Sequence, residues 1–373
     1  NMLELLDPVI KSHKTEISNG LNVHYLEANL NNLKNPTALL LHGFPELSFS
    51  WRKIIPELAK KGFRVIAPDM RGYGLTIGGK KEFNTDISEY RLLNLSTDII
   101  SLISSLNIDV IDMLVGHDAG SSVAAVSALI RPDIFKSVVM MSAPYAGTPN
   151  INTSLTFKDP IHEELEKLDP PRKHYQWYYS SVEANKDMHL EKKQLHRFLR
   201  AYYHMKSADW EGNTPYKLNA WDAENLAKMP EYYIMQLNKN IVESVMPHHP
   251  KNNCYDKWLN DRELEVYTNS FLENSFQPAL NWYRCMTSNY INSDLRVFSD
   301  KKIEVPACFI AGTKDWGIYQ KPGALDIMEQ KLCSNYRGTY IIQNAGHWVQ
   351  QENPQEVVKV LINFYNQNNS FQE

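Results

Sequence analysis

Short apolar runs separated by stretches of helical spacing constrain the fold of this chain more than any other sequence feature. Runs of this kind, without polar alternation, suit strands that are covered on both faces of a parallel sheet. Their alternation with helical stretches predicts an α/β fold with a mostly parallel sheet and helices on both faces. The runs are Ala38–Leu41, Arg64–Ala67, Ile111–Val115, Ser137–Met141, Pro306–Ala311 and Thr339–Ile342.

Helix and turn signals accompany these runs. Apolar residues recur at helical spacing from Leu92 to Leu106, Gly120–Ile130 fits a buried helix, and Val357–Phe364 fits a closing amphipathic helix. Near the start, His13–Ser18 and Leu21–Ala28 alternate apolar and polar residues around Asn19-Gly20. This pattern predicts a hairpin with a two-residue turn.

The strand pattern stops at Pro144 and resumes only after about Phe298. The 155 residues between them are helical, charged and aromatic, without a clean buried strand, and they hold 13 of the 20 tyrosines. Two tandem domains would leave the last two strand-like runs without a sheet. We therefore predict one α/β core, residues 1–143 and 299–373, interrupted by a helical cap at residues 144–298.

The sharpest local motif is Gly116-His117-Asp118-Ala119-Gly120, between a predicted strand and a predicted helix. Glycines on both sides of the central residue allow a tight strand-to-helix turn that lifts its side chain out of the sheet. Asp118 then occupies the nucleophile position that serine usually holds in such a turn. The alternative is that Asp118 only caps the following helix.

Three further segments follow predicted strands. In His42-Gly43-Phe44-Pro45, the glycine lets backbone N–H groups face a cavity, so we expect an oxyanion hole from the N–H groups of Phe44 and Ala119. Asp315 and His347 come later, in the chain order nucleophile, acid, histidine. Sites in open α/β sheets lie beyond the carboxyl ends of the strands, where all these segments converge.

An aspartate nucleophile implies a different chemistry from serine. With an ordinary pKa of about 3.9, a carboxylate is ionised at neutral pH and needs no base to attack. It can displace a leaving group at saturated carbon and form an alkyl ester. His347, oriented by Asp315, would then activate the water that hydrolyses the Asp118 ester. The leaving group would be an epoxide oxygen or a halide.

The motifs resemble those of the soluble epoxide hydrolases of the α/β-hydrolase superfamily. They are H-G-F-P-E (42–46), P-D-M-R-G-Y-G (68–74), G-H-D-A-G (116–120), A-G-T-K-D (311–315) and G-H-W-V-Q-Q-E (346–352). The resemblance implies an α/β-hydrolase fold with a cap, and opening of epoxides to vicinal diols. Residue 119 is Ala where many members carry Trp.

The resemblance also implies two cap tyrosines that bind the epoxide oxygen and donate a proton to it. Asn281-Trp282-Tyr283-Arg284 is similar to one tyrosine motif and gives Tyr283. The segment from His174 to Tyr179 is similar to the other and gives Tyr175, with Tyr178 as the alternative. Most other cap tyrosines would build the core of the cap. We expect Trp51, Tyr178 and Trp348 to contact the substrate.

Two other functions remain open at this stage. A dehalogenase would use the same aspartate chemistry, but the halide-binding Asn and Trp expected beside the site are Phe44 and Ala119 in this chain. A non-catalytic binding protein with a hydrolase fold is the other alternative. Such proteins typically lose the nucleophile or the histidine, and this chain has both.

Composition and charge limit the partners, location and cofactors that we expect for this protein. The net charge is −4 with no basic block, so we expect no nucleic acid partner. No apolar run approaches the roughly 18 residues of a membrane span, and the acidic N-terminus is no secretory signal. Four widely spread cysteines indicate a reduced, cytoplasmic protein. We expect no metal or other cofactor, and a small apolar epoxide and water as partners; the oligomeric state and the natural epoxide stay open.

Overall fold

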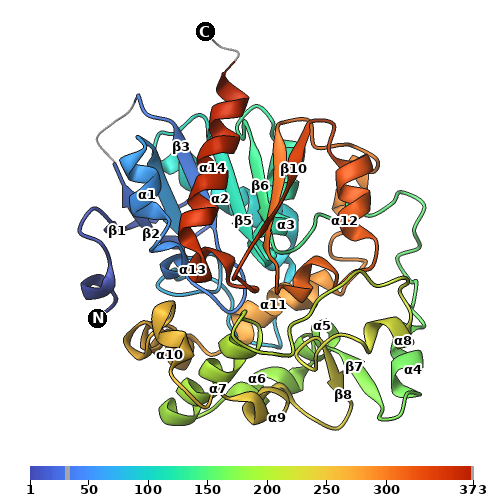
Figure 1. The fold of residues 1–373 in the computed structure, drawn as a ribbon. Helices are drawn as coiled ribbons and strands as arrows, with labels where there is room; N and C mark the ends of the chain where they lie inside the picture. Colours follow the sequence, from blue (N-terminus) through green and yellow to red (C-terminus); the bar gives the residue numbers. More distant parts are fainter. Residues whose placement is uncertain (30–33, 371–373) are drawn as a thin grey trace.

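The computed structural model describes residues 1–29 and 34–370, and its centre is an eight-stranded sheet in the order β1-β2-β4-β3-β5-β6-β9-β10 (Figure 1). β1 pairs antiparallel with β2, and β2 with β4, whereas the other neighbours are parallel. The prediction of a mostly parallel sheet is confirmed. The strands are β1 (Lys11–Glu16), β2 (Asn22–Ala28), β3 (Thr37–Leu41), β4 (Arg64–Pro68), β5 (Met113–His117), β6 (Val138–Met141), β9 (Ala307–Gly312) and β10 (Tyr336–Ile342).

The inner strands are covered on both faces. Every residue of β3, β4, β5, β6 and β9 is buried, which explains why these strands consist of continuous apolar runs. β5 begins two residues later than predicted, because Ile111 only forms an isolated bridge with Phe135. β1 lies at an edge and is partly exposed.

The hairpin at the start of the chain is present, but its predicted two-residue turn is wrong. The Ile17 N–H donates to the Leu21 carbonyl at 2.9 Å, so three residues form the turn. Gly20 has a φ of 87°, a left-handed conformation that favours glycine. Hairpin loops of three residues commonly end in such a position, and the Asn-Gly pair alone does not distinguish them from two-residue loops.

Helices cover both faces of the sheet, as predicted. α1 contacts β2, β4 and α14, whereas α2 packs on α3, and α3 packs on β5 and β6. Figure 1 shows α1 and α14 in front of the sheet and α2 and α3 behind it. Among the described residues, no helix has both the length and the apolar character to cross a bilayer. The core helices are α1 (Ile55–Lys60), α2 (Leu92–Ser105), α3 (Ala119–Ile130), α12 (Ala324–Ile327), α13 (Val349–Glu352) and α14 (Pro354–Asn369).

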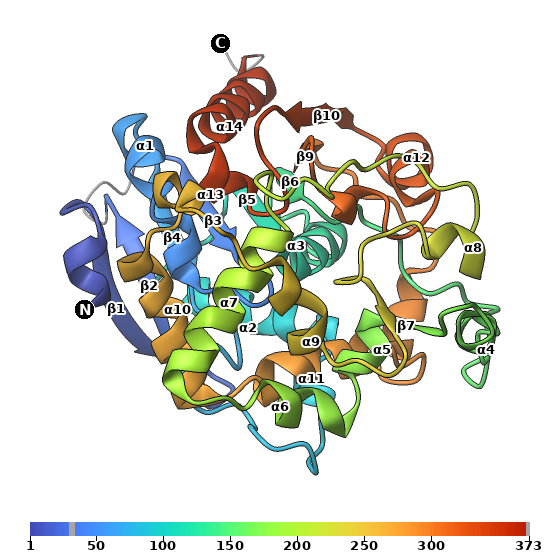
Figure 2. The ribbon, with the colours of Figure 1, turned by 60° about the horizontal axis from the view of Figure 1, so that its bottom comes forward.

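The segment between β6 and β9, all of it described, adds no strand to the eight-stranded sheet. Its helices lie together at one end of the core in Figure 1, and Figure 2 brings α7, α9 and α11 forward. The exact division at residues 144 and 298 stays a prediction, because β6 ends at Met141 and β9 begins at Ala307. The cap helices are α4 (Ile161–Glu166), α5 (Tyr175–Tyr179), α6 (Val182–Met188), α7 (Lys192–Met205), α8 (Ala223–Leu226), α9 (Ile241–Val245), α10 (Asp261–Asn274) and α11 (Gln277–Met286).

One expectation for the cap is corrected. β7 (Arg172–His174) and β8 (Ile234–Gln236) pair antiparallel in a small sheet, although the sequence predicted no clean buried strand there. Each strand has three residues, which is too short for a period-two pattern to stand out. The pair matters for the site, because α5 follows β7 directly and carries Tyr175.

Candidate active site

Asp118 lies at the turn between β5 and α3 with an unusual backbone conformation. Its φ is 56° and its ψ is −122°, and its side chain makes no capping hydrogen bond to α3, which is fully described. The alternative of a helix cap is therefore wrong. The turn is possible because its neighbours lack side chains. A Cβ on Gly116 would lie 2.1 Å from the Gly120 carbonyl oxygen, and one on Gly120 would lie 2.4 Å from that of Leu41.

The loop after β3 meets the Asp118 carboxylate. The Phe44 N–H donates to Asp118 Oδ2 at 2.9 Å, at one of the two predicted oxyanion-hole positions. A Cβ on Gly43 would lie 2.4 Å from Asp118 Cβ, so only glycine allows this approach. Ala119, the other predicted position, begins α3 beside Asp118 and lines the cavity described below.

His347 and Asp315 come together beside Asp118, on the loops that follow β10 and β9. His347 Nδ1 lies 3.1 Å from Asp315 Oδ1 and 2.8 Å from Ser142 Oγ. Ser142 donates its hydroxyl proton to the second oxygen of Asp315, so its own oxygen accepts from His347. The network thus assigns the proton of the neutral imidazole to Nδ1 and leaves Nε2 as a proton acceptor.

The acceptor nitrogen of His347 faces Asp118. His347 Nε2 lies 3.3 Å from Asp118 Oδ1, but the two atoms are not in hydrogen-bond geometry. Burial raises the pKa of Asp118, yet His347, Lys206 and His117 outweigh burial and hold that pKa well below its usual range. Asp118 is therefore an ionised carboxylate, and 14% of its side chain remains exposed toward the cavity.

A cavity of about 170 Å³ opens over Asp118 between the core and the cap. Tyr175 from α5 and Tyr283 from α11 both line it, with ring centroids 6.1 Å apart. The other lining residues are Ala119, Ser122, Ala143, Pro144, Ala146, His174, Gln176, Trp221, Met286, Gln320, Lys321 and Ala324.

Both tyrosines are neutral phenols rather than phenolates. Burial, followed by the charge of Asp118, raises the pKa of Tyr175 and of Tyr283 well above the usual value. Tyr175 donates its hydroxyl to Gln320 at 2.6 Å. The ring of Tyr283 packs edge-on against Phe44, with centroids 5.1 Å apart, which holds it above the loop that contacts Asp118.

Comparison with known proteins identifies the family of this chain. Residues 36–354 match the family described as alpha/beta hydrolase fold. The chain belongs to the α/β hydrolase fold family. It is 28% identical to epoxide hydrolase B of Mycobacterium tuberculosis, over 94% of this chain and 97% of that protein.

Solved structures of epoxide hydrolases superpose on nearly the whole of this α/β hydrolase. An epoxide hydrolase from an endophytic Streptomyces superposes with a TM-score of 0.78 and 26% identity, and covers 96% of both chains. Potato (Solanum tuberosum) epoxide hydrolase I superposes with a TM-score of 0.72 and 26% identity, covering 96% of this chain and 99% of that one.

The three predicted substrate-contacting residues do not line the cavity over Asp118, and this expectation is corrected. Trp51 is fully buried in the core. Tyr178 points toward another groove, where its hydroxyl donates to Asp187 at 2.6 Å. Trp348 packs against the His347 ring, with centroids 4.7 Å apart, and donates its indole N–H to the Tyr203 carbonyl. The place of these residues in or near a sequence motif does not indicate in which direction their side chains point.

Several site residues lay outside the sequence predictions. Ser142 directly follows β6, so its place at a strand end was the one available signal. Gln320 and Lys321 follow β9 on a loop without a distinctive motif, and Trp221 comes from the cap. Their approach to Asp118 depends on how the cap packs on the core.

Two buried histidines of the α/β hydrolase hold loops in place. His42 Nε2 accepts the Met70 N–H at 3.0 Å. His117 pairs through Nδ1 with Glu46 at 2.9 Å, and its Nε2 lies 2.7 Å from the His347 carbonyl oxygen. Neither ring lines the cavity over Asp118.

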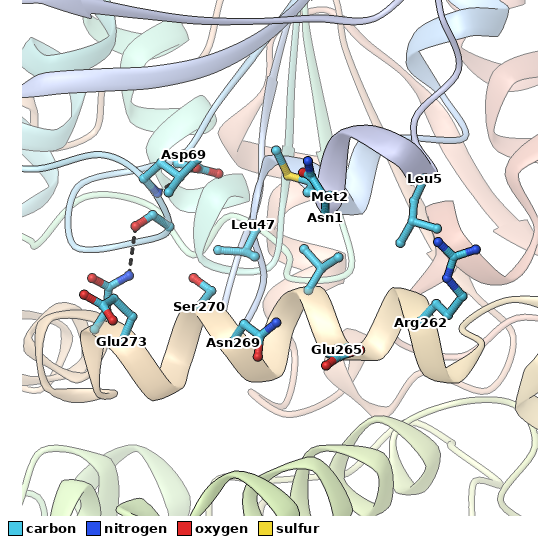
Figure 3. Close-up of a pocket in the computed structure, with 14 residues that line it drawn as sticks. Asn1, Met2, Leu5, Leu47, Asp69, Arg262, Glu265, Asn269, Ser270 and Glu273 are labelled. Atoms are coloured by element: carbon cyan, nitrogen blue, oxygen red, sulfur yellow. Dashed lines mark hydrogen bonds between the residues drawn. The ribbon is translucent and has the colours of Figure 1, made fainter.

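A larger cavity, of about 330 Å³, lies away from this chemistry, between the N-terminal turn and α10. Figure 3 shows Met2 and Leu5 facing Asn269 and Arg262 across it. Its buried acid, Asp69, already accepts hydrogen bonds from the backbone of Ser48 and Leu75. Nothing among its described lining residues resembles the arrangement around Asp118.

The residues best placed to hold a metal ion are in the cap, although its histidines show no ligand spacing in the sequence. Ligand atoms of His204, Asp209 and Cys254 lie within 4.8 Å of one another. The Asp209 carboxylate already accepts from the Trp258 indole at 2.9 Å and pairs with Lys257 at 3.1 Å. These partners satisfy the carboxylate without a metal ion.

Gly43→Ala tests whether the close approach of the β3 loop is essential. The added methyl group would press on Asp118 Cβ and on the His117 carbonyl oxygen, 2.7 Å away. Overpacking of this kind costs about 2 kcal/mol, so we expect a clear loss of stability in denaturant unfolding. Gly79→Ala is the control, because its closest neighbour is the Tyr90 hydroxyl at 3.0 Å. Equal stability of both variants and wild type would contradict the packing described for the turn.

Proposed function

We propose that this α/β hydrolase opens epoxides to vicinal diols through an alkyl ester on Asp118. The observation that carries the proposal is the position of one ionised carboxylate between three groups. Phe44 donates to one of its oxygens, His347 lies beside the other, and two tyrosines line the cavity above it. The names of the similar proteins, all epoxide hydrolases, support the same reaction.

The two oxygens of Asp118 have different roles in the first step. Oδ2, bound by the Phe44 N–H, becomes the carbonyl oxygen, so Oδ1 is the attacking atom. Oδ1 forms a bond to an epoxide carbon, and the bond from that carbon to the ring oxygen breaks. The electron pair goes to the ring oxygen, which takes a proton from Tyr175 or Tyr283. The products are an ester, a hydroxyl group and a tyrosinate.

The second step hydrolyses the ester. His347 takes a proton from water at Nε2, while Asp315 and Ser142 hold Nδ1. The hydroxide attacks Cγ of Asp118, and negative charge develops on Oδ2, where the N–H of Phe44 and, as predicted, that of Ala119 stabilise it. The bond between Cγ and Oδ1 then breaks, so Oδ1 leaves with the diol and takes the proton of the new hydroxyl group on Cγ. The protonated His347 returns its proton to the tyrosinate, which restores both groups.

The cavity favours a small substrate with an apolar part. Alanines, Pro144 and Met286 contribute much of its lining, and its volume is about 170 Å³. A dry apolar cavity of about 150 Å³ can hold benzene. A monocyclic aryl epoxide such as styrene oxide is therefore a suitable first probe.

We also propose the predicted cytoplasmic location for this protein, which its four unpaired cysteines support.

Trapping the ester tests the proposed function directly. In His347→Gln the water is not activated, so incubation with styrene oxide is expected to add one substrate mass to the protein and to Asp118 in peptide maps. Asp118→Asn is the matched control and should gain no mass. A dehalogenase would instead release halide from haloalkanes or fluoroacetate and form no diol. The absence of an adduct with a panel of epoxides would favour a binding protein.

The tyrosines give a second test. General acid catalysis is worth about a hundredfold or more in rate, and two donors can share the task. We expect Tyr175→Phe and Tyr283→Phe each to slow ester formation by about tenfold, and the double variant to lose at least about a hundredfold, in rapid-quench mass measurements. Tyr179→Phe is the control, because Tyr179 packs 5.0 Å from the Tyr283 ring but does not line the cavity. Equal effects of all three single variants would contradict these roles.

A further inference from the structure

Lys206 is a buried cation that the reaction above does not use. It follows α7 in the cap and is 4% exposed. No ion pair joins it to a carboxylate in the described part of the chain. Its carbonyl accepts the His347 N–H at 2.9 Å, so its backbone lies directly against the loop of the predicted base.

Aromatic rings surround the ammonium group of Lys206. Its Nζ lies 4.9 Å from the ring centroid of Tyr233, 5.3 Å from Tyr202, 5.7 Å from Tyr232 and 5.4 Å from Trp348. Nζ also donates to the Tyr202 hydroxyl at 3.5 Å. The negative face of an aromatic ring attracts a cation. The four rings therefore hold the charge in one place without neutralising it.

The same rings connect Lys206 to the two proton donors. Tyr233 packs against Tyr175, with centroids 4.7 Å apart. The Tyr202 hydroxyl lies 3.5 Å from that of Tyr179, whose ring packs 5.0 Å from Tyr283. Lys206 is thus one ring behind Tyr175 and two rings behind Tyr283.

The acidic groups close enough to act on Lys206 are Asp118, Asp315 and Glu46. Burial lowers the pKa of Lys206, and these three carboxylates oppose that effect. Glu46 already has a partner in His117. Tyr202, Tyr232 and Tyr233 have pKa values well above the usual range because of burial, so they are neutral. The other two carboxylates, Asp118 and Asp315, share the imidazole of His347, and Lys206 is the ammonium that acts on both.

A buried cation without a direct carboxylate partner costs stability, which a methionine of similar shape would not. Proteins keep such costly groups mainly where function needs them. Lys206 lies against the loop of His347 and one ring behind Tyr175, and this position indicates what that function is.

We propose that Lys206 is the fixed counter-charge of the active site and that it speeds formation of the Asp118 ester. This inference rests on the proposed function. In that step, one negative charge leaves Asp118 and appears on Tyr175 or Tyr283. Lys206 stabilises the charge at its new position, most directly on Tyr175, because the Tyr233 ring against the ammonium also packs against Tyr175. It is a positioning residue, since it does not touch the substrate.

The test compares Lys206→Met with wild type in single-turnover ester formation from styrene oxide, followed by rapid-quench intact mass. We expect the variant to be at least tenfold slower. In wild type the rate of ester formation should fall at alkaline pH as Lys206 loses its proton. This fall, the alkaline limb of the pH–rate profile, should be absent from Lys206→Met. Lys206→Arg should keep the rate and move the limb to higher pH, because guanidinium stays protonated.

Stability separates this role from a purely structural one. Because the pKa of Lys206 is lowered in the folded protein, the unfolded chain binds the proton more readily. The protonated ammonium therefore lowers the free energy of unfolding, and this cost disappears as the pH rises. We therefore expect Lys206→Met to have an equal or higher Tm at neutral pH. Lys53→Met is the control: Lys53 is half-buried and donates to the Trp258 and Gln351 carbonyls, and its loss should leave ester formation unchanged.

The outcomes are distinct. If wild type forms no adduct, the proposed function fails, and this inference fails with it. If wild type forms the adduct and Lys206→Met does so at the same rate and pH dependence, only this inference is overturned. If Lys206→Met does not fold, the comparison of wild type with Lys206→Arg decides, and identical alkaline limbs would contradict the role of Lys206.

Discussion

The whole site depends on one strained turn, in which the backbone at Asp118 has a positive φ. Such a conformation costs roughly 1–3 kcal/mol for a residue other than glycine and persists only where its surroundings enforce it. Here the enforcement is steric, because Gly43, Gly116 and Gly120 let three backbone segments approach more closely than any side chain would allow. The result is a carboxylate that leaves the sheet and meets the cavity instead of capping α3.

Buried charged side chains are the second feature on which the site depends. Asp118, Asp315 and Glu46 are carboxylates inside the protein, each with a lowered pKa despite burial. His117 pairs with Glu46 in the core, and we propose that Lys206 supplies a positive charge from the cap. On this proposal, core and cap share the electrostatics of the site, and a residue of the long insertion acts on a carboxylate that belongs to the sheet.

The sequence was informative wherever function depends on local geometry. Asp118, Asp315 and His347 each follow a strand, so fold and residue type together indicate that they meet. Ser142 is also at a strand end, but a serine there has no pattern to distinguish it. Trp51, Tyr178 and Trp348 were misjudged because a side chain in or near a motif can point away from the cavity. Residues such as Gln320 reach the cavity only through packing between the cap and distant loops, which no local spacing encodes.

The central claim is that Asp118 itself gives an oxygen atom to the product. A single turnover in H₂¹⁸O, with enzyme in excess over epoxide, tests it most directly. If water attacks the ester carbonyl, the first diol contains no ¹⁸O, and the peptide that carries Asp118 becomes heavier by one ¹⁸O-for-¹⁶O exchange. If the first diol carries ¹⁸O and the peptide is unchanged, water attacks the epoxide directly and the ester does not form.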